Sequence, residues 1–253
     1  MAPETIVLLH GFTQTGRAWE PTIAALGERY RALAPDIRGH GAAADVRPVS
    51  FDAVRADVLA LAPERFVLGG YSMGGRIALS VALAAPERVA RLVLVGASPG
   101  LADPAERRAR RAADEALADR IEGEGIEAFA AGWSSLPLFA GQPAPVAAAA
   151  HAERLAQSPA GLAAALRGLG TGVMEPLWER LSSLSVPVTL VVGERDAKFR
   201  AIAERMAAAL PAAALHVVPG AGHAVQLEAP EVVVAELLAP TPARPARDRP
   251  APA

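Results

Sequence analysis

Six short runs of β-branched and aliphatic residues alternate with stretches of helical pattern, and this alternation limits the fold more than any other feature of the chain. The runs are nearly continuously apolar, as in parallel strands that helices cover on both faces. They are Thr5–Leu9, Tyr30–Ala34, Phe66–Gly69, Leu92–Val95, Val188–Val192 and Leu215–Val218. The helical stretches between them are Ala18–Glu28, Phe51–Leu61 (capped by Ser50), Met73–Ala85, Phe199–Leu210 and Pro230–Leu238. The pattern predicts an α/β fold with a mostly parallel, doubly wound sheet of about six strands and right-handed crossovers.

The alternation stops between residues 98 and 185. This stretch holds alanine-rich helical patterns, interrupted at Pro137, Pro143, Pro145, Pro159 and Pro176. A helical insertion between two sheet strands is expected to cover the carboxyl end of the sheet, where α/β proteins bind ligands. We therefore predict a core formed by residues 1–97 and 186–239, a helical cap at 98–185, and a frayed tail without catalytic role at 240–253, which is rich in proline and arginine.

The composition excludes several classes of protein. Of 253 residues, 52% are hydrophobic and 21% charged, which suits a buried core and not a disordered chain. A net charge of -2 gives no basic footprint for nucleic acid, and the absence of cysteine excludes disulfides and thiolate chemistry. No metal-ligand spacing occurs, so we expect neither a metal nor a cofactor. Because no signal-peptide or membrane-span pattern is present, we expect a cytoplasmic protein that acts on a small molecule. A monomer is favoured, with the oligomeric state left open.

The pentapeptide Gly70-Tyr71-Ser72-Met73-Gly74 lies between an apolar run and a helical pattern. G-x-S-x-G in that position forms a sharp turn that presents a serine nucleophile above a parallel sheet. Glycines are needed because the two backbones come too close for a Cβ. For the pentapeptide alone, a turn of small residues without chemistry is the alternative.

A serine hydroxyl needs an imidazole to take its proton and a carboxylate to orient that imidazole. Asp196 follows the run at Val188–Val192, and His223 follows the last run, at the end of the loop Pro219-Gly220-Ala221-Gly222. The order Ser, Asp, His at the ends of three strands predicts a catalytic triad of Ser72, Asp196 and His223. Glu194 is the nearer rival for the acid, and Asp36 a weaker one.

The loop after the first run is expected to complete an oxyanion hole. The N–H groups of Phe12 and Met73 would form it at the positive end of the helix that follows Ser72. We interpret His10 as a brace for this loop rather than a substrate contact, and His40 as a residue that orders the loop after the second run. His151 and His216 are expected at the surface or in packing.

Two arginines point to an anionic ligand. Of the 25 basic residues only Lys198 is a lysine, so the number of arginines carries no functional signal and their positions must. Arg76 would lie in the first turn of a helix, where a cation opposes the helix dipole; an anionic ligand or an ion pair with a cap carboxylate would each explain it. Arg110 shares a helical stripe with Leu117 and Ile121, so it should face inward and need a counter-charge, such as a substrate carboxylate. Arg154 and Arg167 are further candidates.

Several segments together resemble the 2-succinyl-6-hydroxy-2,4-cyclohexadiene-1-carboxylate synthase family, lyases of menaquinone biosynthesis with the α/β-hydrolase fold. They are Gly70 to Arg76, Ser98-Pro99-Gly100-Leu101, an arginine-rich first cap helix, Trp133 with Pro137-Leu138-Phe139, Gly193 to Phe199, and Gly220-Ala221-Gly222-His223. The resemblance runs from about Ile6 to Leu238.

The resemblance implies elimination of pyruvate from an enolpyruvyl cyclohexene that carries ring and succinyl carboxylates. It implies the triad Ser72, Asp196 and His223, and substrate contacts from Tyr71, Arg76, Arg110, Arg154 and Trp133. The chain begins its first strand at Thr5, so the antiparallel strands that usually open this fold should be missing. One departure is Ala224, where the family usually has asparagine or a similar polar residue after the histidine.

Two other functions stay open at this point. A cytoplasmic serine hydrolase, such as an esterase, thioesterase or carbon–carbon hydrolase, would use the same triad as a nucleophile. A ligand receptor without catalysis is the third class, and the complete triad argues against it.

Overall fold

The computed structural model describes residues 4–239. Six parallel strands form one sheet in the order β2-β1-β3-β4-β5-β6. They are β1 (Glu4–Leu9), β2 (Tyr30–Leu33), β3 (Phe66–Tyr71), β4 (Val89–Val95), β5 (Val188–Gly193) and β6 (Ala213–Val218). The predicted doubly wound sheet of six strands is confirmed, and within the described residues no antiparallel strand precedes β1.

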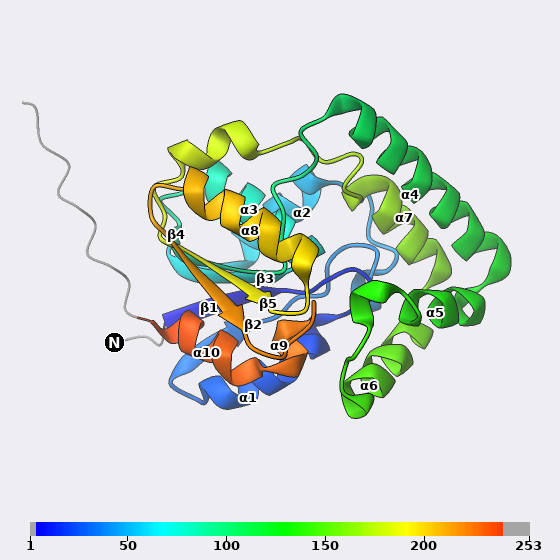
Figure 1. The fold of residues 1–253 in the computed structure, drawn as a ribbon, viewed down its shortest axis with the longest axis horizontal. Helices are drawn as coiled ribbons and strands as arrows, with labels where there is room; N and C mark the ends of the chain where they lie inside the picture. The colour runs from blue at the N-terminus through cyan, green and yellow to red at the C-terminus, as the bar shows by residue number, and fades with distance from the viewer. Residues whose placement is uncertain (1–3, 240–253) are drawn as a thin grey trace, which may run out of the picture.

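Two layers of helices cover the sheet, as Figure 1 shows above and below it. The helices are α1 (Glu20–Leu26), α2 (Phe51–Leu61), α3 (Met73–Ala84), α8 (Ala197–Ala209), α9 (Val225–Glu228) and α10 (Pro230–Leu238). Side chains alternate along a strand, so Val7 and Leu9 of β1 join the cluster with α2, α3 and α8. Ile6 and Leu8 join the opposite cluster with α1, α9 and α10. Burial on both faces is the reason for the continuously apolar strands.

Capping residues fix where several helices begin. Ser50 Oγ accepts the Ala53 N–H and starts α2, as predicted. Asp196 accepts the Phe199 N–H, so α8 begins two residues before the predicted start. The single helix predicted at Ala18–Glu28 is wrong in detail. The segment is a 3-10 turn, η1 (Gly16–Trp19), followed by α1. Helix α1 ends at Leu26, because the next residue, Gly27, has a φ of 68°.

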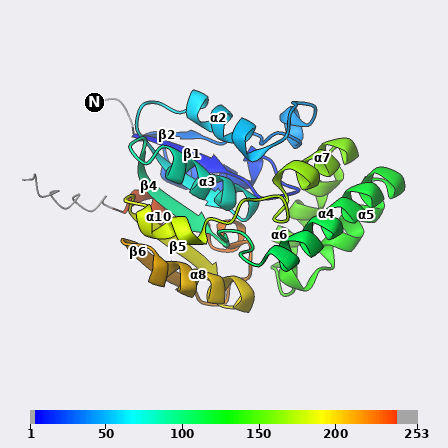
Figure 2. The same cartoon turned by 90° about the horizontal axis from the view of Figure 1, so that it is seen from above.

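Between β4 and β5 the described chain forms the helical insertion. Its elements are α4 (Pro104–Glu124), α5 (Ile126–Ser134), η3 (Pro137–Phe139), α6 (Ala144–Leu155), α7 (Pro159–Leu169) and η4 (Trp178–Ser183). Ile121, Phe129 and Leu162 belong to a separate apolar cluster that joins α4, α5 and α7. Figure 2 shows α4 to α7 grouped beside one end of the sheet. The predicted helical cap is therefore present, while its division from the core at residues 98 and 185 stays a prediction.

The predicted tail and the predicted absence of a membrane span concern different parts of the chain. The tail predicted at 240–253 lies outside the described residues. Over residues 4–239, every helix is too short or too polar to cross a bilayer.

Candidate active site

Ser72 lies on a strained turn between β3 and α3. Its φ is 50° and its ψ is -108°, a conformation that few residues other than glycine adopt. A Cβ on Gly70 would lie 2.5 Å from the Gly74 carbonyl oxygen, and one on Gly74 would overlap the Leu9 carbonyl. The two glycines thus allow the close approach that lifts the serine above the sheet, as the sequence predicts.

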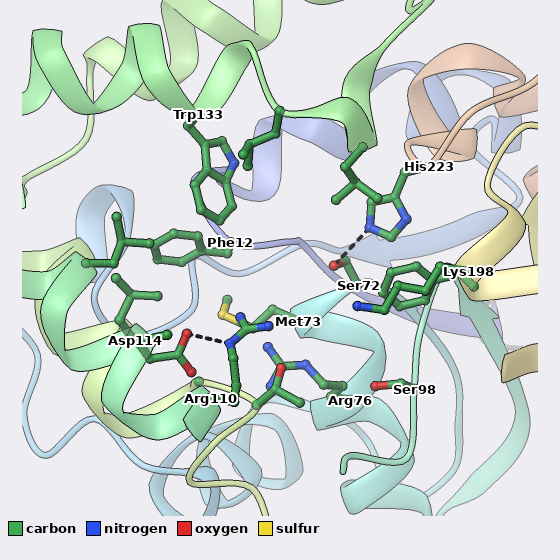
Figure 3. A pocket seen from close by; sticks show the side chains of 18 of the residues that line it. Phe12, Ser72, Met73, Arg76, Ser98, Arg110, Asp114, Trp133, Lys198 and His223 are labelled. Carbon is green, nitrogen blue, oxygen red and sulfur yellow. Dashed lines mark hydrogen bonds and ion pairs between the residues drawn. The ribbon is translucent and has the colours of Figure 1, made fainter. Parts of the chain in front are cut away.

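The three predicted triad residues meet in the structure, and Figure 3 shows the contact between Ser72 and His223. His223 Nδ1 donates to Asp196 Oδ2 at 2.6 Å, since a carboxylate can only accept. His223 Nε2 then accepts from Ser72 Oγ at 3.2 Å. His223 is 2% exposed and Asp196 7% exposed. This arrangement can draw a proton from the hydroxyl and stabilise the resulting imidazolium.

The two rival carboxylates serve as braces for loops. Glu194 accepts the Gly220 N–H at 2.9 Å and so holds the loop that carries the histidine. Asp36 accepts the N–H groups of Gly16 and Ala42, both at 2.8 Å. Asp196 is therefore the carboxylate that contacts the imidazole.

Phe12 and Met73, the two residues expected to supply the oxyanion hole, both line the cavity beside Ser72. Among residues 4–239 neither N–H donates a hydrogen bond. Met73 is the first residue of α3, whose N-terminal N–H groups carry the positive end of the helix dipole. Both N–H groups are thus free to stabilise a developing negative charge.

His10 braces the oxyanion loop, in agreement with the interpretation from sequence. Its Nδ1 donates to the Gly11 carbonyl at 2.8 Å, and its Nε2 accepts the Ile37 N–H at 2.9 Å. Burial lowers the pKa of His10 to about 4, so the ring stays neutral. His40 packs edge-on against the rings of His10 and Phe12, and burial lowers its pKa to about 3.

The remaining two histidines have local partners. His151 Nδ1 lies 3.0 Å from Ser134 Oγ, and His216 Nδ1 lies 3.1 Å from Glu236 Oε1. Neither belongs to the residues that line the catalytic cavity within the described chain.

A cavity of about 740 Å³ separates the triad from the cap. Its apolar walls include Phe12, Leu117, Trp133 and Leu166. Five cationic side chains line it, against two carboxylates, those of Asp114 and Asp196; the cations are Arg76, Arg110, Arg120, Arg195 and Lys198. Asp114 pairs with Arg110, and Glu228 pairs with Arg195. Arg76, Arg120 and Lys198 therefore give the cavity an excess of positive charge over Asp196, which suits an anionic ligand.

Arg76 is 9% exposed and has no ion pair within residues 4–239. Its Nη1 donates to the Leu169 carbonyl at 2.9 Å. Burial, with the nearby charge of Arg110, lowers the pKa of Arg76 to about 10. Of the two explanations that the sequence left open, the ion pair with a cap carboxylate is absent from the described residues, and the anionic ligand remains.

Arg110 lines the cavity, as its place on the inward stripe predicts, but part of that prediction is wrong. Its counter-charge is supplied internally, because Nε donates to Asp114 Oδ1 at 2.7 Å. Asp114 is 4% exposed and lies one helical turn after Arg110. The Arg110 side chain is 42% exposed and lines the cavity, so it can still receive a second carboxylate.

The other predicted substrate contacts divide into two groups. Trp133 lines the cavity, and its buried Nε1–H has no hydrogen-bond partner among the described residues. Tyr71 and Arg154 are buried and do not belong to the cavity lining of residues 4–239. Arg154 Nη1 donates to Ser134 Oγ at 2.9 Å, and the Tyr71 ring lies 5.2 Å from the His223 ring. Their contact with substrate stays a prediction.

Arg167, the further candidate, is not part of this site. It binds Glu115, Asp119 and Glu122, at 2.8, 2.6 and 3.0 Å. Its place in the site was suggested by charge alone, and three carboxylates of α4 account for that charge.

Sequence reasoning assigned no role to three cations that the cavity contains. Lys198 and Arg120 have no ion pair in the part of the chain that the structure describes, and Figure 3 shows the Lys198 side chain beside Ser72. Arg195 also lines the cavity. For Lys198 a signal existed, because it is the one lysine of the chain and follows Asp196 by two residues. No group of three or more potential metal ligands occurs within residues 4–239.

Comparison with known proteins places this fold and site in a family. A model described as the alpha/beta hydrolase family matches residues 6–236. A Bacillus subtilis protein, provisionally named 2-succinyl-6-hydroxy-2,4-cyclohexadiene-1-carboxylate synthase, is 39% identical over 252 residues, which cover 94% of this chain and 91% of that protein. A Salmonella enteritidis PT4 protein with the same synthase name is 34% identical over 240 residues, 92% of each chain.

A solved structure gives the same answer. The structure described as MenH from S. aureus has a TM-score of 0.88 and 32% identity, and covers 93% of this chain and 92% of that chain. The chain therefore belongs to the alpha/beta hydrolase family and, within it, to the 2-succinyl-6-hydroxy-2,4-cyclohexadiene-1-carboxylate synthases.

Proposed function

We propose that this protein is a lyase that eliminates pyruvate from 2-succinyl-5-enolpyruvyl-6-hydroxy-3-cyclohexene-1-carboxylate to give 2-succinyl-6-hydroxy-2,4-cyclohexadiene-1-carboxylate. Family membership supports the reaction, because the names of the relatives state synthesis of the proposed product. The observation that carries the proposal is the aligned triad of Ser72, His223 and Asp196 at a cavity with more cations than carboxylates. A cytoplasmic enzyme acting as a monomer on a small carboxylate is part of the same proposal.

The cations of the cavity would bind the three carboxylates of this substrate. Arg76 forms no ion pair within the described residues, and the Arg110 side chain is partly exposed. Each can hold a carboxylate through a bidentate, charge-assisted pair of hydrogen bonds. Lys198 offers a third cation, and the free Nε1–H of Trp133 a neutral donor. Tyr71 and Arg154, which are buried and do not line the cavity, remain proposed contacts.

The triad would act as a base rather than as a nucleophile. Ser72 Oγ, with its own proton drawn to His223 Nε2, removes the ring proton next to the succinyl ketone. The electron pair forms an enolate, whose oxygen the N–H groups of Phe12 and Met73 stabilise. The enolate then collapses, the ring double bond shifts, and the carbon–oxygen bond to the enolpyruvyl group breaks. The abstracted proton passes from the triad to the departing enolpyruvate, which becomes pyruvate. No acyl-enzyme forms in this sequence.

Removal of the serine hydroxyl tests this role. We expect Ser72→Ala to lower the rate of pyruvate release by roughly 10³-fold or more, since it removes the group that contacts the ring proton. Pyruvate and the diene product are followed together. Ser183→Ala serves as the control, because that exposed hydroxyl of η4 bonds only to the Arg180 carbonyl among the described residues. Undiminished release from Ser72→Ala would rule the mechanism out.

A serine hydrolase is the second candidate, favoured by the same 3.2 Å contact between Ser72 Oγ and His223 Nε2. The triad cannot separate the two functions, but the arginines can. In the lyase, Arg76→Ala should impair pyruvate release far more than turnover of a neutral ester. Equal and unchanged rates for both reactions would remove the support for a carboxylate-binding cavity.

A further inference from the structure

A buried carboxylate outside the triad holds the loop that carries the catalytic histidine. Glu228 is the last residue of α9, and its side chain is 3% exposed. Its Oε2 accepts the N–H of Gly222 at 2.8 Å, directly before His223. Its Oε1 is buried without a hydrogen-bond partner among the described residues. Such a carboxylate is costly to bury, which indicates that its position matters.

The same oxygen binds Arg195, the residue before the catalytic acid. Arg195 Nη2 donates to Glu228 Oε2 at 2.8 Å. The Arg195 backbone N–H donates to the Ala221 carbonyl at 3.0 Å. The loop of Asp196 and the loop of His223 are therefore joined at the residues next to the acid and the base. A shift of either loop changes the distance between the carboxylate and the imidazole.

Arg195 also contacts the cap. Its Nη1 donates to the Gly141 carbonyl, between η3 and α6, at 2.6 Å. Gly141 has a φ of 75°, and a Cβ there would collide with the guanidinium. One guanidinium thus holds three segments that are far apart in the sequence.

We propose that Arg195 and Glu228 are positioning residues for the catalytic triad. They hold the acid loop, the histidine loop and the cap at Gly141 in the arrangement in which His223 reaches both Asp196 and Ser72. The role applies to any reaction of this triad, and it rests on the proposed lyase function only for the kinetic part of its test. Because Arg195 also lines the cavity, the rival role is direct binding of a substrate carboxylate.

Four variants separate these roles: Arg195→Met, Arg195→Lys, Glu228→Gln and the double variant Arg195→Met/Glu228→Gln. Misplacement of the imidazole by about 1 Å lowers the rate roughly 10²-fold, so we expect that loss in kcat for pyruvate release with little change in KM. The double variant should lose no more than about the larger single loss, because the pair acts as a unit. Arg195→Lys keeps the charge and one donor, and should restore part of the rate. Arg200→Met is the matched control, since it ends an exposed ion pair with Glu204 on α8, outside the cavity.

A second readout needs no substrate. The proton of His223 Nδ1, bound to Asp196 at 2.6 Å, should give a far-downfield resonance in the proton NMR spectrum that disappears in Asp196→Asn. We expect this resonance to shift or vanish in Arg195→Met and Glu228→Gln and to stay in Arg200→Met. Urea unfolding of each variant shows which are folded under the assay conditions. If Glu228→Gln fails to fold, the two Arg195 variants carry the test.

The outcomes assign one role or the other. A raised KM with an unchanged resonance would make Arg195 a substrate contact and overturn the proposal. Unchanged kinetics and an unchanged resonance in Arg195→Met and Glu228→Gln would overturn it as well. If the wild-type protein releases no pyruvate, the proposed lyase function fails, and the resonance still tests the positioning role.

Discussion

We expect the buried charge of Arg76 to lower the free energy of unfolding of the protein. Its charge is buried and has no ion pair in the described chain, and its pKa is lowered from 12.5 to about 10. At ~1.4 kcal/mol per pKa unit, this shift corresponds to roughly 3 kcal/mol. Because the folded state lowers the pKa of a base, the penalty is fully present below about pH 10, and so at pH 7, and it declines only as pH rises from about 10 toward 12.5.

Replacement by methionine, which is similar in length and neutral, removes that penalty. It also removes the hydrogen bond to the Leu169 carbonyl, at a loss of about 1–2 kcal/mol for an acceptor left without a partner. The net expectation for Arg76→Met is a gain of about 1–2 kcal/mol in the free energy of unfolding. In a domain of this size, the melting temperature should rise by roughly 2–8 °C.

The same substitution should impair the reaction. A charge-assisted pair with a substrate carboxylate contributes about 1.5–3 kcal/mol or more in a buried site. We therefore expect kcat/KM for pyruvate release to fall by roughly 10²-fold, since each 1.4 kcal/mol is a factor of about ten. Arg76→Lys should restore only part of this loss, because an ammonium cannot form the bidentate fork.

The assay combines a melting curve with steady-state kinetics. Arg180→Met is the control, since that arginine also donates to a carbonyl, that of Leu83, but is exposed and lies outside the catalytic cavity. Its melting temperature and kcat/KM should change little. A fall of several degrees in Arg76→Met, with kcat/KM preserved, would show that Arg76 stabilises the fold and would refute the argument.

Three further predictions use other parts of the molecule. Burial lowers the pKa of His10 to about 4, so its neutral form contributes stability that is complete above about pH 6.5 and is lost as pH falls toward 4. Urea unfolding at pH 7 and pH 5 should therefore show a loss in the free energy of unfolding that His10→Gln reduces. An equal loss in both proteins would contradict this prediction. Gly74→Ala should lower the free energy of unfolding by about 1–3 kcal/mol or more, because the new Cβ overlaps neighbouring carbonyls. Gly123→Ala, in α4 with open space around it, should raise the free energy of unfolding by about 0.5–1 kcal/mol. Equal effects of the two substitutions on unfolding would argue against the crowding at Gly74. Lys198→Met should raise KM about tenfold while the melting temperature changes little, because the side chain is exposed at the cavity; an unchanged KM would exclude it as a carboxylate contact.

The sheet and the triad could be predicted because both leave a local pattern in the sequence. Parallel strands buried on two faces are continuously apolar, and each triad residue lies within five residues after the end of such a run. The predicted run at Leu215–Val218 begins two residues after the start of β6, since Ala213 and Ala214 resemble the helical stretches around them. The split of the first helix at Trp19 could have been suspected from Pro21, which favours a helix start.

Partners of charged residues were harder to predict, for two different reasons. Asp114 follows Arg110 by four residues, so the spacing of an ion pair on a helix was visible in the sequence. The contacts of Arg195 with Gly141 and Glu228 were not visible, because they depend on the paths of three separate loops. For the same reason, similarity of motifs could suggest Tyr71 and Arg154 as substrate contacts but not their place behind the cavity lining.

The charges around the cavity suggest why one triad would perform elimination rather than hydrolysis. The charge of Arg110 lies close enough to lower the pKa of Arg76. Among the described residues Asp114 forms an ion pair with Arg110, and no carboxylate forms one with Arg76. The free protein therefore holds a buried cation without an ion pair four residues from Ser72, and a ligand with carboxylates reduces that penalty when it binds. Binding energy of this kind depends on where the carboxylates lie, so it fixes the substrate in one orientation. When the ring proton is held at Ser72 Oγ, the triad abstracts it as a base. A neutral ester forms no ion pair with the arginines, so it would contact the same hydroxyl without that fixed orientation.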